Sequence, residues 1–325
     1  MRLALVQELA SRVGFESYAW VLTDAETEVG SAPLADTPSV ADVPRLIRAK
    51  YLTPTNRWTS LAGSVATLVG ATGGDAAQSL VWREVLSSYS VVDVASVVFR
   101  DQHGCWAWLD LWRSGGTSPF IAAEQAYLQA VAGPVTEALR SCQARTFQAS
   151  SPLARSGPAV LLLSPSLEVK AQTAETEAYL RALVPPDGDR RPIPAGAYHV
   201  AAQLLAVEAG VDSHEPSARV HLRDGIWMTL RAARVADASR DADQDIAVTI
   251  EPTSPAERRS LFARSHAFTA RETELVGHLA AGADTRTIAE ELFVSEHTVQ
   301  DHLKSIFAKT GARNRRTLLT RLTGR

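Results

Sequence analysis

Residues 268–322 decide the fold at the C-terminal end of this chain: "FTARETELVGHLAAGADTRTIAEELFVSEHTVQDHLKSIFAKTGARNRRTLLTRL". Thr269 stands three residues before Glu272, which is the spacing of a capping box, where two side chains satisfy the first backbone amides of a helix. This pattern predicts a helix over about 270–281. Gly282 suits the end of that helix.

Two more caps divide the rest of this segment. Thr285 is expected to cap a second helix and Ser295 a third, because a hydroxyl oxygen accepts a hydrogen bond from a free amide of the first turn. The third helix should end near Thr310, since Gly311 suits the left-handed residue that follows a helix. A fourth helix is predicted over 314–322. Four short helices with a three-residue turn between the second and third make a helix-turn-helix.

The third helix has an apolar face and a polar face when its residues are placed at about 100° intervals. The apolar face, which should join the core, holds Val299, Leu303, Ile306 and Phe307. The opposite face holds His297, Gln300, Asp301, Lys304 and Ala308. His297 and Asp301 could share a metal ion, but His302 lies about 140° from His297 and cannot converge on it. No metal site is therefore expected, and His302 should be partly buried beside the core.

The polar face carries side chains that suit the base edges in the major groove of DNA. An α-helix fits this groove, where Gln300 can pair with adenine, Lys304 with guanine acceptors and Asp301 with the cytosine amino group. His297 lies on the same face. Phosphate contacts are expected from the end of this helix and the start of the next, at Lys309, Arg313, Arg315 and Arg316.

The charge distribution supports a polyanion-binding end. From His302 onward there are seven Lys or Arg and no Asp or Glu, whereas the whole chain has a formal net charge of −3, so the residues before this segment carry −10. A basic end on an acidic protein is typical of nucleic-acid binding. A solvated polar face remains the alternative for the third helix, but it does not explain the acid-free stretch.

This segment resembles the LuxR-type helix-turn-helix of bacterial transcription regulators. The matching residues are Glu272, Gly282, Ile288, Ala289, Leu292, Ser295, Thr298, Val299, His302, Phe307, Lys309, Gly311 and Arg315. The resemblance implies that Gln300, Asp301 and Lys304 face the bases, and that Thr298, Lys309 and Arg315 lie near the DNA backbone. It also implies a homodimer, often through the fourth helix, with Leu318, Leu319 and Leu322 as candidate contacts.

The residues upstream are predicted to form two α+β blocks, so the chain as a whole is multidomain. Over 1–143 the order of elements and the hairpin "VVFRDQHGCWAWLDLWR" resemble a GAF-type sensory domain, and 144–158, rich in Ser, Ala and Pro, is predicted to be a linker. The order of strands and helices over 159–264 is similar to a PAS-type domain. The helix-turn-helix domain takes 265–325. One continuous α+β body over the first two blocks is the alternative.

A small-molecule site in these blocks would be largely apolar, with a few polar groups. The aromatic candidates are Trp58, Trp82, Trp106 and Trp108; packing in the core is the alternative for each. In the second strand of the hairpin, Trp106, Trp108, Asp110 and Trp112 should share one face and Cys105, Ala107, Leu109 and Leu111 the other. No cofactor is expected, with a haem held by His199 or His221 as the alternative. The glycine-rich "LVGATGGDAA" at 68–77 has no βαβ unit around it and is predicted to be a flexible loop.

Other classes of protein are disfavoured by what the sequence lacks. No apolar run approaches the roughly eighteen residues of a membrane span, and the chain is expected in the cytosol. Its two cysteines are far apart and in no paired motif, which argues against a disulfide framework or a thiolate metal site. No nucleophile with a base and no paired carboxylates are recognisable, so an enzyme is not expected.

Together these patterns predict a transcription regulator that binds double-stranded DNA. Its sensory blocks would respond to a small-molecule ligand or a partner, and RNA polymerase is a further candidate partner. Two alternatives stay open: an architectural DNA-binding protein that needs no ligand, and an enzyme fused to a DNA-binding appendage.

Overall fold

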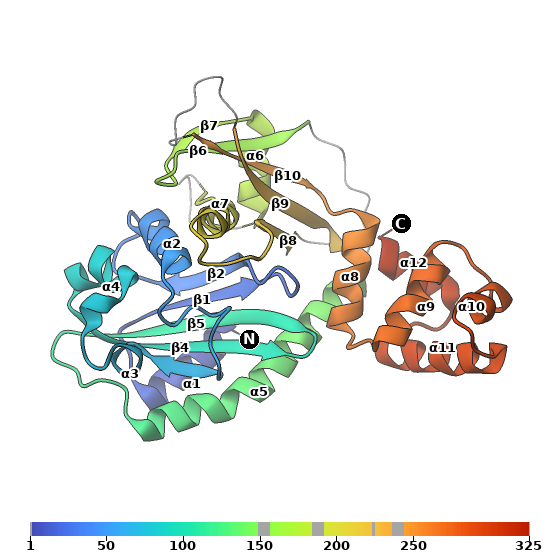
Figure 1. The fold of residues 1–325 in the computed structure, drawn as a ribbon, viewed down its shortest axis with the longest axis horizontal. Helices are drawn as coiled ribbons and strands as arrows, with labels where there is room; N and C mark the ends of the chain where they lie inside the picture. The colour runs from blue at the N-terminus through green and yellow to red at the C-terminus, as the bar shows by residue number, and fades with distance from the viewer. Residues whose placement is uncertain (1, 149–156, 184–191, 223–224, 236–243, 325) are drawn as a thin grey trace. The chain divides into compact units, whose positions relative to one another are not determined.

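The computed structural model describes residues 2–148, 157–183, 192–222, 225–235 and 244–324 (Figure 1). The chain forms two compact units. The first is made of Met1–Thr136, Ser156–Val220 and Thr229–Glu251, and the second of Glu137–Arg155, His221–Met228 and Pro252–Arg325. No helix in the described ranges is both long and apolar enough to cross a membrane.

The first unit contains a five-stranded antiparallel sheet with the order β2-β1-β5-β4-β3. Its strands are β1 (Ser17–Thr23), β2 (Gly30–Asp36), β3 (Val65–Thr67), β4 (Val91–Asp101) and β5 (Gly104–Ser114). The predicted hairpin is confirmed, since β4 and β5 pair Asp101 with Gly104 across a two-residue turn. Gly104 has a φ of 146°, and a Cβ atom there would lie 2.0 Å from the Ala25 carbonyl oxygen, so the turn requires glycine.

Helices lie on both faces of this sheet (Figure 1). One face carries α1 (Arg2–Val13) and α5 (Ala122–Arg145), and the other carries α2 (Val43–Leu52) and α4 (Leu80–Glu84). Both sets of alternating side chains along β5 are consequently buried. The predicted flexible loop at 68–77 is wrong in part, because Leu68–Thr72 forms the short helix α3, which begins where the Thr67 side chain accepts a hydrogen bond from the Gly70 amide.

A second five-stranded sheet follows, with the order β7-β6-β10-β9-β8. Its strands are β6 (Ala159–Leu163), β7 (Val169–Gln172), β8 (Ser217–His221), β9 (Trp227–Arg234) and β10 (Ile246–Pro252). Counted from its own first strand, this sheet has the same strand order as the first. Two helices, α6 (Ala174–Leu183) and α7 (Ala195–Glu208), lie between β7 and β8 in the chain.

Helix α7 lies between the two sheets within the first unit (Figure 1). It packs against α2 and β2, and small residues allow the close approach. A Cβ atom on Gly196 would lie 3.3 Å from Leu230 of β9 and 3.4 Å from the Ser31 carbonyl oxygen of β2. A Cβ atom on Gly30 would lie 2.7 Å from Nδ1 of His199. The two blocks predicted from the sequence therefore share a packed boundary.

The second unit is helical over its C-terminal part. It contains α8 (Pro255–Ser265), α9 (Ala270–Ala280), α10 (Thr285–Glu291), α11 (Glu296–Thr310) and α12 (Arg315–Thr323). The last four are the helices predicted from the sequence. Of the predicted linker, 149–156 lies outside the described residues, and 144–148 forms the end of α5 and the short η3 (Thr146–Gln148).

Aromatic side chains from distant parts of the sequence form a core in this unit. Phe147 stacks on Trp227 at 5.1 Å between ring centroids and meets the edge of Phe262 at 5.3 Å. The Arg258 guanidinium lies over Phe147 and donates to the carbonyl oxygens of Gly225 and Arg321. Arg258 thus places a positive charge at the C-terminal end of α12, where the helix dipole favours it.

Candidate nucleic-acid interface and a cavity in the first unit

The helix ends of the C-terminal segment follow the predicted caps with one exception. Thr269 and Glu272 form the expected capping box, and Ser295 caps α11 by accepting a hydrogen bond from the Thr298 amide at 3.1 Å. The cap predicted at Thr285 is wrong. Asp284 caps α10 instead, because its carboxylate accepts from the Thr287 amide at 2.8 Å. Asp is at least as good a cap as Thr, and it stands one residue earlier.

The apolar face of α11 is packed into the core as predicted for three of its four residues. Val299, Leu303 and Ile306 are buried, whereas Phe307 is only half-buried. His302 is half-buried, in agreement with its expected place at the edge of the core. The turn before this helix passes through Phe293, which has a φ of 54° and is exposed.

The polar face of α11 is open to solvent. The side chains of His297, Asp301 and Lys304 are 85 %, 54 % and 73 % exposed. Asp301 accepts a hydrogen bond from Lys304 Nζ at 2.9 Å and lies 3.6 Å from His297 Nε2. The Lys304 hydrogen bond and charge lower the pKa of the Asp301 carboxyl. Gln300, also exposed, donates to the Thr285 hydroxyl at 3.4 Å. This face therefore offers both hydrogen-bond donors and hydrogen-bond acceptors.

The five residues expected to contact phosphate have different surroundings. Arg313 and Arg316 are exposed. Arg315 is half-buried and donates to the Thr285 hydroxyl, and the Thr298 hydroxyl lies 2.9 Å from that of Ser295. Lys309 Nζ donates to Glu272 Oε2 at 2.6 Å and to the Ala267 carbonyl oxygen at 3.0 Å. The Lys309 ammonium thus takes part in an internal contact.

Glu272 is the buried centre of this contact. Its carboxylate accepts hydrogen bonds from Lys309, from the Ser305 hydroxyl at 2.7 Å and from the Thr269 amide at 2.7 Å. Burial would raise the pKa of Glu272, but these hydrogen bonds and the Lys309 charge lower it below its usual value. One carboxylate therefore joins the start of α9 to the end of α11.

Two of the three leucines expected as dimer contacts on α12 are not exposed. Leu318 and Leu322 are fully buried inside the second unit, where α12 packs against α8 and α9. Leu319 is half-buried. Helix α8, which is not among the four predicted helices, supplies part of this packing.

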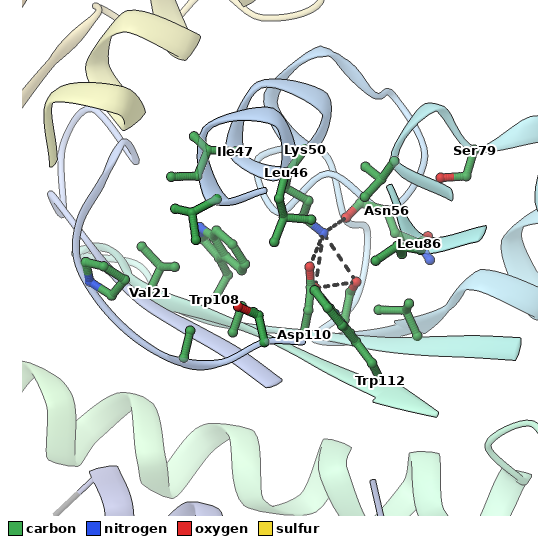
Figure 2. A pocket seen from close by; sticks show the side chains of 18 of the residues that line it. Val21, Leu46, Ile47, Lys50, Asn56, Ser79, Leu86, Trp108, Asp110 and Trp112 are labelled. Carbon is green, nitrogen blue, oxygen red and sulfur yellow. Dashed lines mark hydrogen bonds and ion pairs between the residues drawn. The ribbon is translucent and has the colours of Figure 1, made fainter. Parts of the chain in front are cut away.

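A cavity of about 80 Å³ lies in the first unit (Figure 2). Its wall is mostly apolar. Helix α2 supplies Leu46 and Ile47, the first sheet supplies Val21, Val94 and Trp112, and α7 supplies Ala195. Helix α2, the first sheet and α7 thus line one cavity.

Four residues of this wall, Lys50, Asn56, Ser96 and Asp110, are joined by polar contacts (Figure 2). Lys50 Nζ lies 2.8 Å from Asp110 Oδ2 and also donates to the Asn56 carbonyl oxygen at 3.3 Å. The Ser96 hydroxyl donates to Asp110 Oδ1 at 2.7 Å. Lys50 and Asp110 are both buried, so the two opposite charges neutralise each other inside the protein.

The four candidate tryptophans occupy different places. Trp108 lines the cavity. Trp58 is stacked on Trp108 at 5.2 Å between ring centroids and donates from Nε1 to the Glu28 carbonyl oxygen at 2.8 Å. Trp82 donates to the Val91 carbonyl oxygen and Trp106 to Asp101. Trp58, Trp82 and Trp106 are not among the residues that line the cavity.

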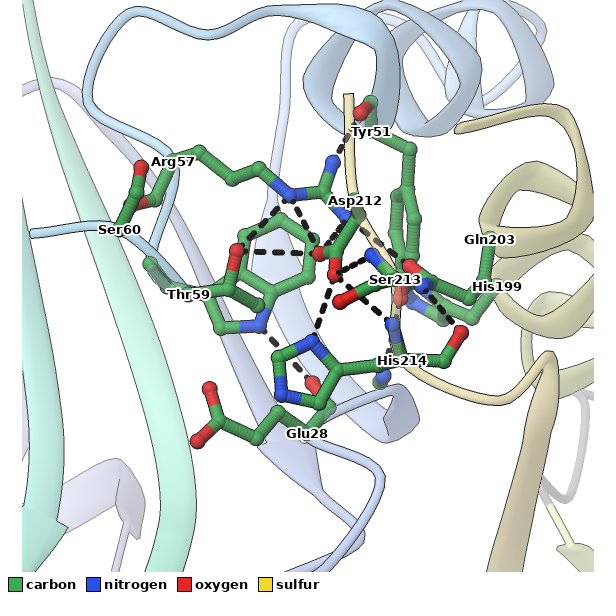
Figure 3. A network of polar contacts seen from close by, with 12 residues as sticks. Glu28, Tyr51, Arg57, Thr59, Ser60, His199, Gln203, Asp212, Ser213 and His214 are labelled. Carbon is green, nitrogen blue, oxygen red and sulfur yellow. Dashed lines mark hydrogen bonds and ion pairs between the residues drawn. The ribbon is translucent and has the colours of Figure 1, made fainter. Parts of the chain in front are cut away.

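A polar network joins α7 and the loop after it to the first block (Figure 3). Arg57 donates to Asp212 at 2.6 Å and to the Gln203 side-chain oxygen at 2.8 Å. His214 Nδ1 lies 2.6 Å from the other Asp212 oxygen. Burial opposes ionisation of Asp212, but hydrogen bonds from His214 and the Arg57 charge hold its pKa well below the usual range. The hydrogen bond with Asp212 also raises the pKa of His214.

A second buried ion pair lies across the same boundary. Arg219 donates to both carboxylate oxygens of Asp24 at 2.6 Å, and the Arg219 amide donates to the same carboxylate at 2.8 Å. This is bidentate pairing, the geometrically most specific form of an Arg–carboxylate contact. Groups of three or more His, Cys, Asp or Glu arranged to hold a metal ion are absent from the described part of the chain.

Comparison with known proteins agrees with the helix arrangement. Residues 266–322 match the family model GerE, described as bacterial regulatory proteins of the luxR family. The "Monoamine regulon transcriptional regulator" of Klebsiella aerogenes is 47 % identical over 53 residues, which are 16 % of this chain and 23 % of that protein. The "CsgBAC operon transcriptional regulatory protein" of Escherichia coli (strain K12) is 45 % identical over 47 residues, 14 % of this chain and 22 % of that protein.

The match therefore spans less than a quarter of the length of each of these relatives. Among solved structures, the "Sensor region of a sensor histidine kinase" is similar over 76 % of this chain and 87 % of that one, at 16 % identity and a TM-score of 0.18, which is too low to support an argument about fold. The resemblance seen in the C-terminal sequence is confirmed. The C-terminal segment of this chain is a helix-turn-helix domain of the luxR family.

Proposed function

We propose that this protein is a sequence-specific transcription regulator in which α11 enters the major groove of double-stranded DNA. The observation that carries the proposal is the exposed face of α11 within a luxR-family domain. Gln300 and Lys304 are donors suited to purine edges, and Asp301 is an acceptor suited to the cytosine amino group. His297 extends this face at the start of the helix.

Phosphate contacts in this proposal come mainly from Arg313, Arg315 and Arg316. Arg313 and Arg316 are exposed, and Arg315, the first residue of α12, donates to Thr285 at the start of α10, which fixes the position of its guanidinium. Thr298 and Lys309 are also assigned to the backbone contact. For Lys309 this requires that its ammonium leave, or share, the contact with Glu272.

We assign a sensory role to the residues before the C-terminal domain, with GAF-like 1–143 and PAS-like 159–264. The support is that each block builds its own five-stranded sheet and that both sheets have the same strand order. A small molecule or a partner acting on this part of the chain would control binding of DNA in the cytosol. A homodimer, formed through the sensory blocks or through the side of α12 that carries the half-buried Leu319, and contact with RNA polymerase complete the proposal.

An enzymatic role is not part of it. The relatives are described as transcriptional regulators. They match this chain over the domain that we propose to bind DNA. An architectural protein would bind DNA with little preference for sequence. A sequence-specific regulator, in contrast, must bind some base sequences more tightly than others.

Selection from a random-sequence duplex library tests the proposal. The full chain should enrich a defined motif, and the enriched duplex should bind at least about a thousand times more tightly than a scrambled one at physiological salt. Enrichment of no motif, with equal binding to both duplexes, would favour the architectural alternative. Absence of DNA binding at low salt would rule out both.

A further inference from the structure

We infer that the cavity of the first unit binds an uncharged small molecule that has an apolar body and a hydrogen-bond-accepting oxygen, which receives N–H groups from Trp108 and His199. This inference deepens the sensory part of the proposed function. The residues that carry it belong to β5 and α7, two elements far apart in the chain.

The first donor is on His199. Its Nδ1 lies 3.1 Å from the Tyr51 hydroxyl, whose oxygen already accepts a hydrogen bond from the Gly30 amide at 2.9 Å. If Nδ1 also donated to this oxygen, the buried Tyr51 proton would have no acceptor. Tyr51 therefore donates to Nδ1, and the neutral ring carries its own proton on Nε2.

His199 Nε2 is buried and has no hydrogen-bond partner among the residues that the structure describes. The side of the ring around Nδ1 faces Gly30 and Tyr51. The opposite side, which carries Nε2, is therefore the one left to face the cavity that His199 lines. Burial lowers the pKa of His199 to about 3, so the ring is neutral and Nε2 acts as a donor at neutral pH.

The second donor is on Trp108. Its indole Nε1 is also buried and has no partner in the described ranges, although the ring lines the cavity. An indole N–H can only donate. A buried donor without an acceptor is costly, so two such donors in the lining of one cavity indicate a place for an acceptor atom from outside the chain.

The charge of the cavity selects an uncharged ligand. Lys50 and Asp110 are directly paired, and Ser96 and Asn56 supply their further hydrogen bonds. Neither charge is therefore left over to neutralise a carboxylate or an ammonium group on the ligand. The rest of the wall is largely apolar, which suits a hydrocarbon body but makes an uncompensated ionic group costly to bury.

The ligand would also contact both blocks of the first unit. Trp108 belongs to the first sheet, and His199 belongs to α7, which packs on the second sheet through Gly196. A molecule that binds both residues stabilises the conformation of the first unit in which Trp108 and His199 line the same cavity. This is the differential contact that a ligand needs in order to shift a conformational equilibrium.

Binding of four matched probes to the full chain tests the inference. Acetophenone has the required ketone oxygen, and α-methylstyrene has the same shape with CH₂ in place of that oxygen. Benzoate and 1-phenylethylamine are charged analogues of similar size. We expect saturable binding of acetophenone, seen by ligand-detected NMR and by thermal shift, with a Kd in the millimolar range or tighter. The other three probes should bind more weakly, α-methylstyrene by about threefold to tenfold, the equivalent of one neutral hydrogen bond.

Two tryptophan variants provide a matched pair. Trp108→Phe removes the unpaired donor and should weaken acetophenone binding by about threefold to tenfold while leaving α-methylstyrene binding less changed. Trp106→Phe removes a buried indole N–H on the same strand that donates to Asp101 instead, and should leave the preference for acetophenone intact. The comparison of probes on the unmodified protein needs no variant, so it stays decisive if a variant fails to fold.

Equal binding of acetophenone and α-methylstyrene would overturn the assignment of the two donors. Tighter binding of benzoate or 1-phenylethylamine would overturn the assignment of an uncharged ligand. Saturable binding of none of the four would mean that the cavity takes no ligand. These measurements involve no DNA, so their failure would leave the proposed DNA recognition standing, and a failed DNA selection would leave a positive probe result standing.

Discussion

Asp212→Asn should destabilise the first unit strongly, because it breaks a buried ion pair while preserving side-chain shape. Arg57 and Asp212 are 1 % and 4 % exposed, and their charged groups are 2.6 Å apart. Asparagine cannot neutralise the guanidinium, which would remain buried with an uncompensated charge. Removing one partner of such a pair costs about 3–5 kcal/mol, a large part of the stability of an ordinary domain.

Glu177→Gln is the matched control. It breaks the Arg181–Glu177 pair on α6, which has a similar separation of 2.9 Å, but its side chains are 41 % and 44 % exposed. Exposed pairs contribute about 0–1 kcal/mol. The two variants should therefore differ by about 3 kcal/mol in the free energy of unfolding of the first unit.

Urea denaturation followed by tryptophan fluorescence measures this difference. Six of the seven tryptophans lie in Met1–Thr136, so the signal reports mainly on the first unit. If Asp212→Asn lowered the free energy of unfolding no more than Glu177→Gln, the Arg57–Asp212 pair would not be buried as described. The two blocks would then not pack against each other at this ion pair as described.

Three further effects are expected. The hydrogen bond with Asp212 raises the pKa of His214 from its usual value of 6.5. The stabilising contribution of His214 is therefore complete below pH 6.5 and is lost as the pH rises through the raised pKa of the folded state. The stability difference between the unmodified protein and His214→Asn should consequently shrink between pH 5.5 and pH 9. Lys309→Met should lower the free energy of unfolding of the C-terminal domain by about 1–3 kcal/mol, because the buried Glu272 carboxylate would lose a hydrogen-bond partner. A thermal melt followed by circular dichroism would show no change if the contact is absent. Ser295→Ala should cost about 1 kcal/mol in the same melt by removing the cap of α11.

Much of the C-terminal domain could be predicted because its signals are local. A cap is recognised by residues three apart, and a helix face by residues three or four apart, so the ends and core face of α11 follow from its own sequence. The error at Thr285 arose between two adjacent residues that can both cap a helix. The role of Lys309 was harder to predict, since its partner Glu272 lies 37 positions earlier and is reached only when α9 and α11 pack.

The cavity could not be located from the sequence for the same reason. Its polar groups come from α2, the first sheet and α7, and Lys50 and Asp110 are 60 positions apart. Alternation along β5 correctly placed Trp108 and Asp110 on one face. Nothing local in the sequence, however, brings His199 to the same wall, because that depends on Gly30 and Gly196 allowing α7 to approach β2.

Discrimination between an enriched duplex and its scrambled counterpart tests the central claim most directly. The binding of the full chain to both duplexes should be measured by fluorescence anisotropy over a range of salt concentrations. Lys304→Ala and Gln300→Ala should each lower the discrimination by about 1–3 kcal/mol. Arg315→Ala should weaken binding to both duplexes alike and lower the salt slope by about one. Arg12→Ala, which removes an exposed cation on α1, should change neither quantity. Undiminished discrimination in both α11 variants would contradict the assignment of this helix to the major groove.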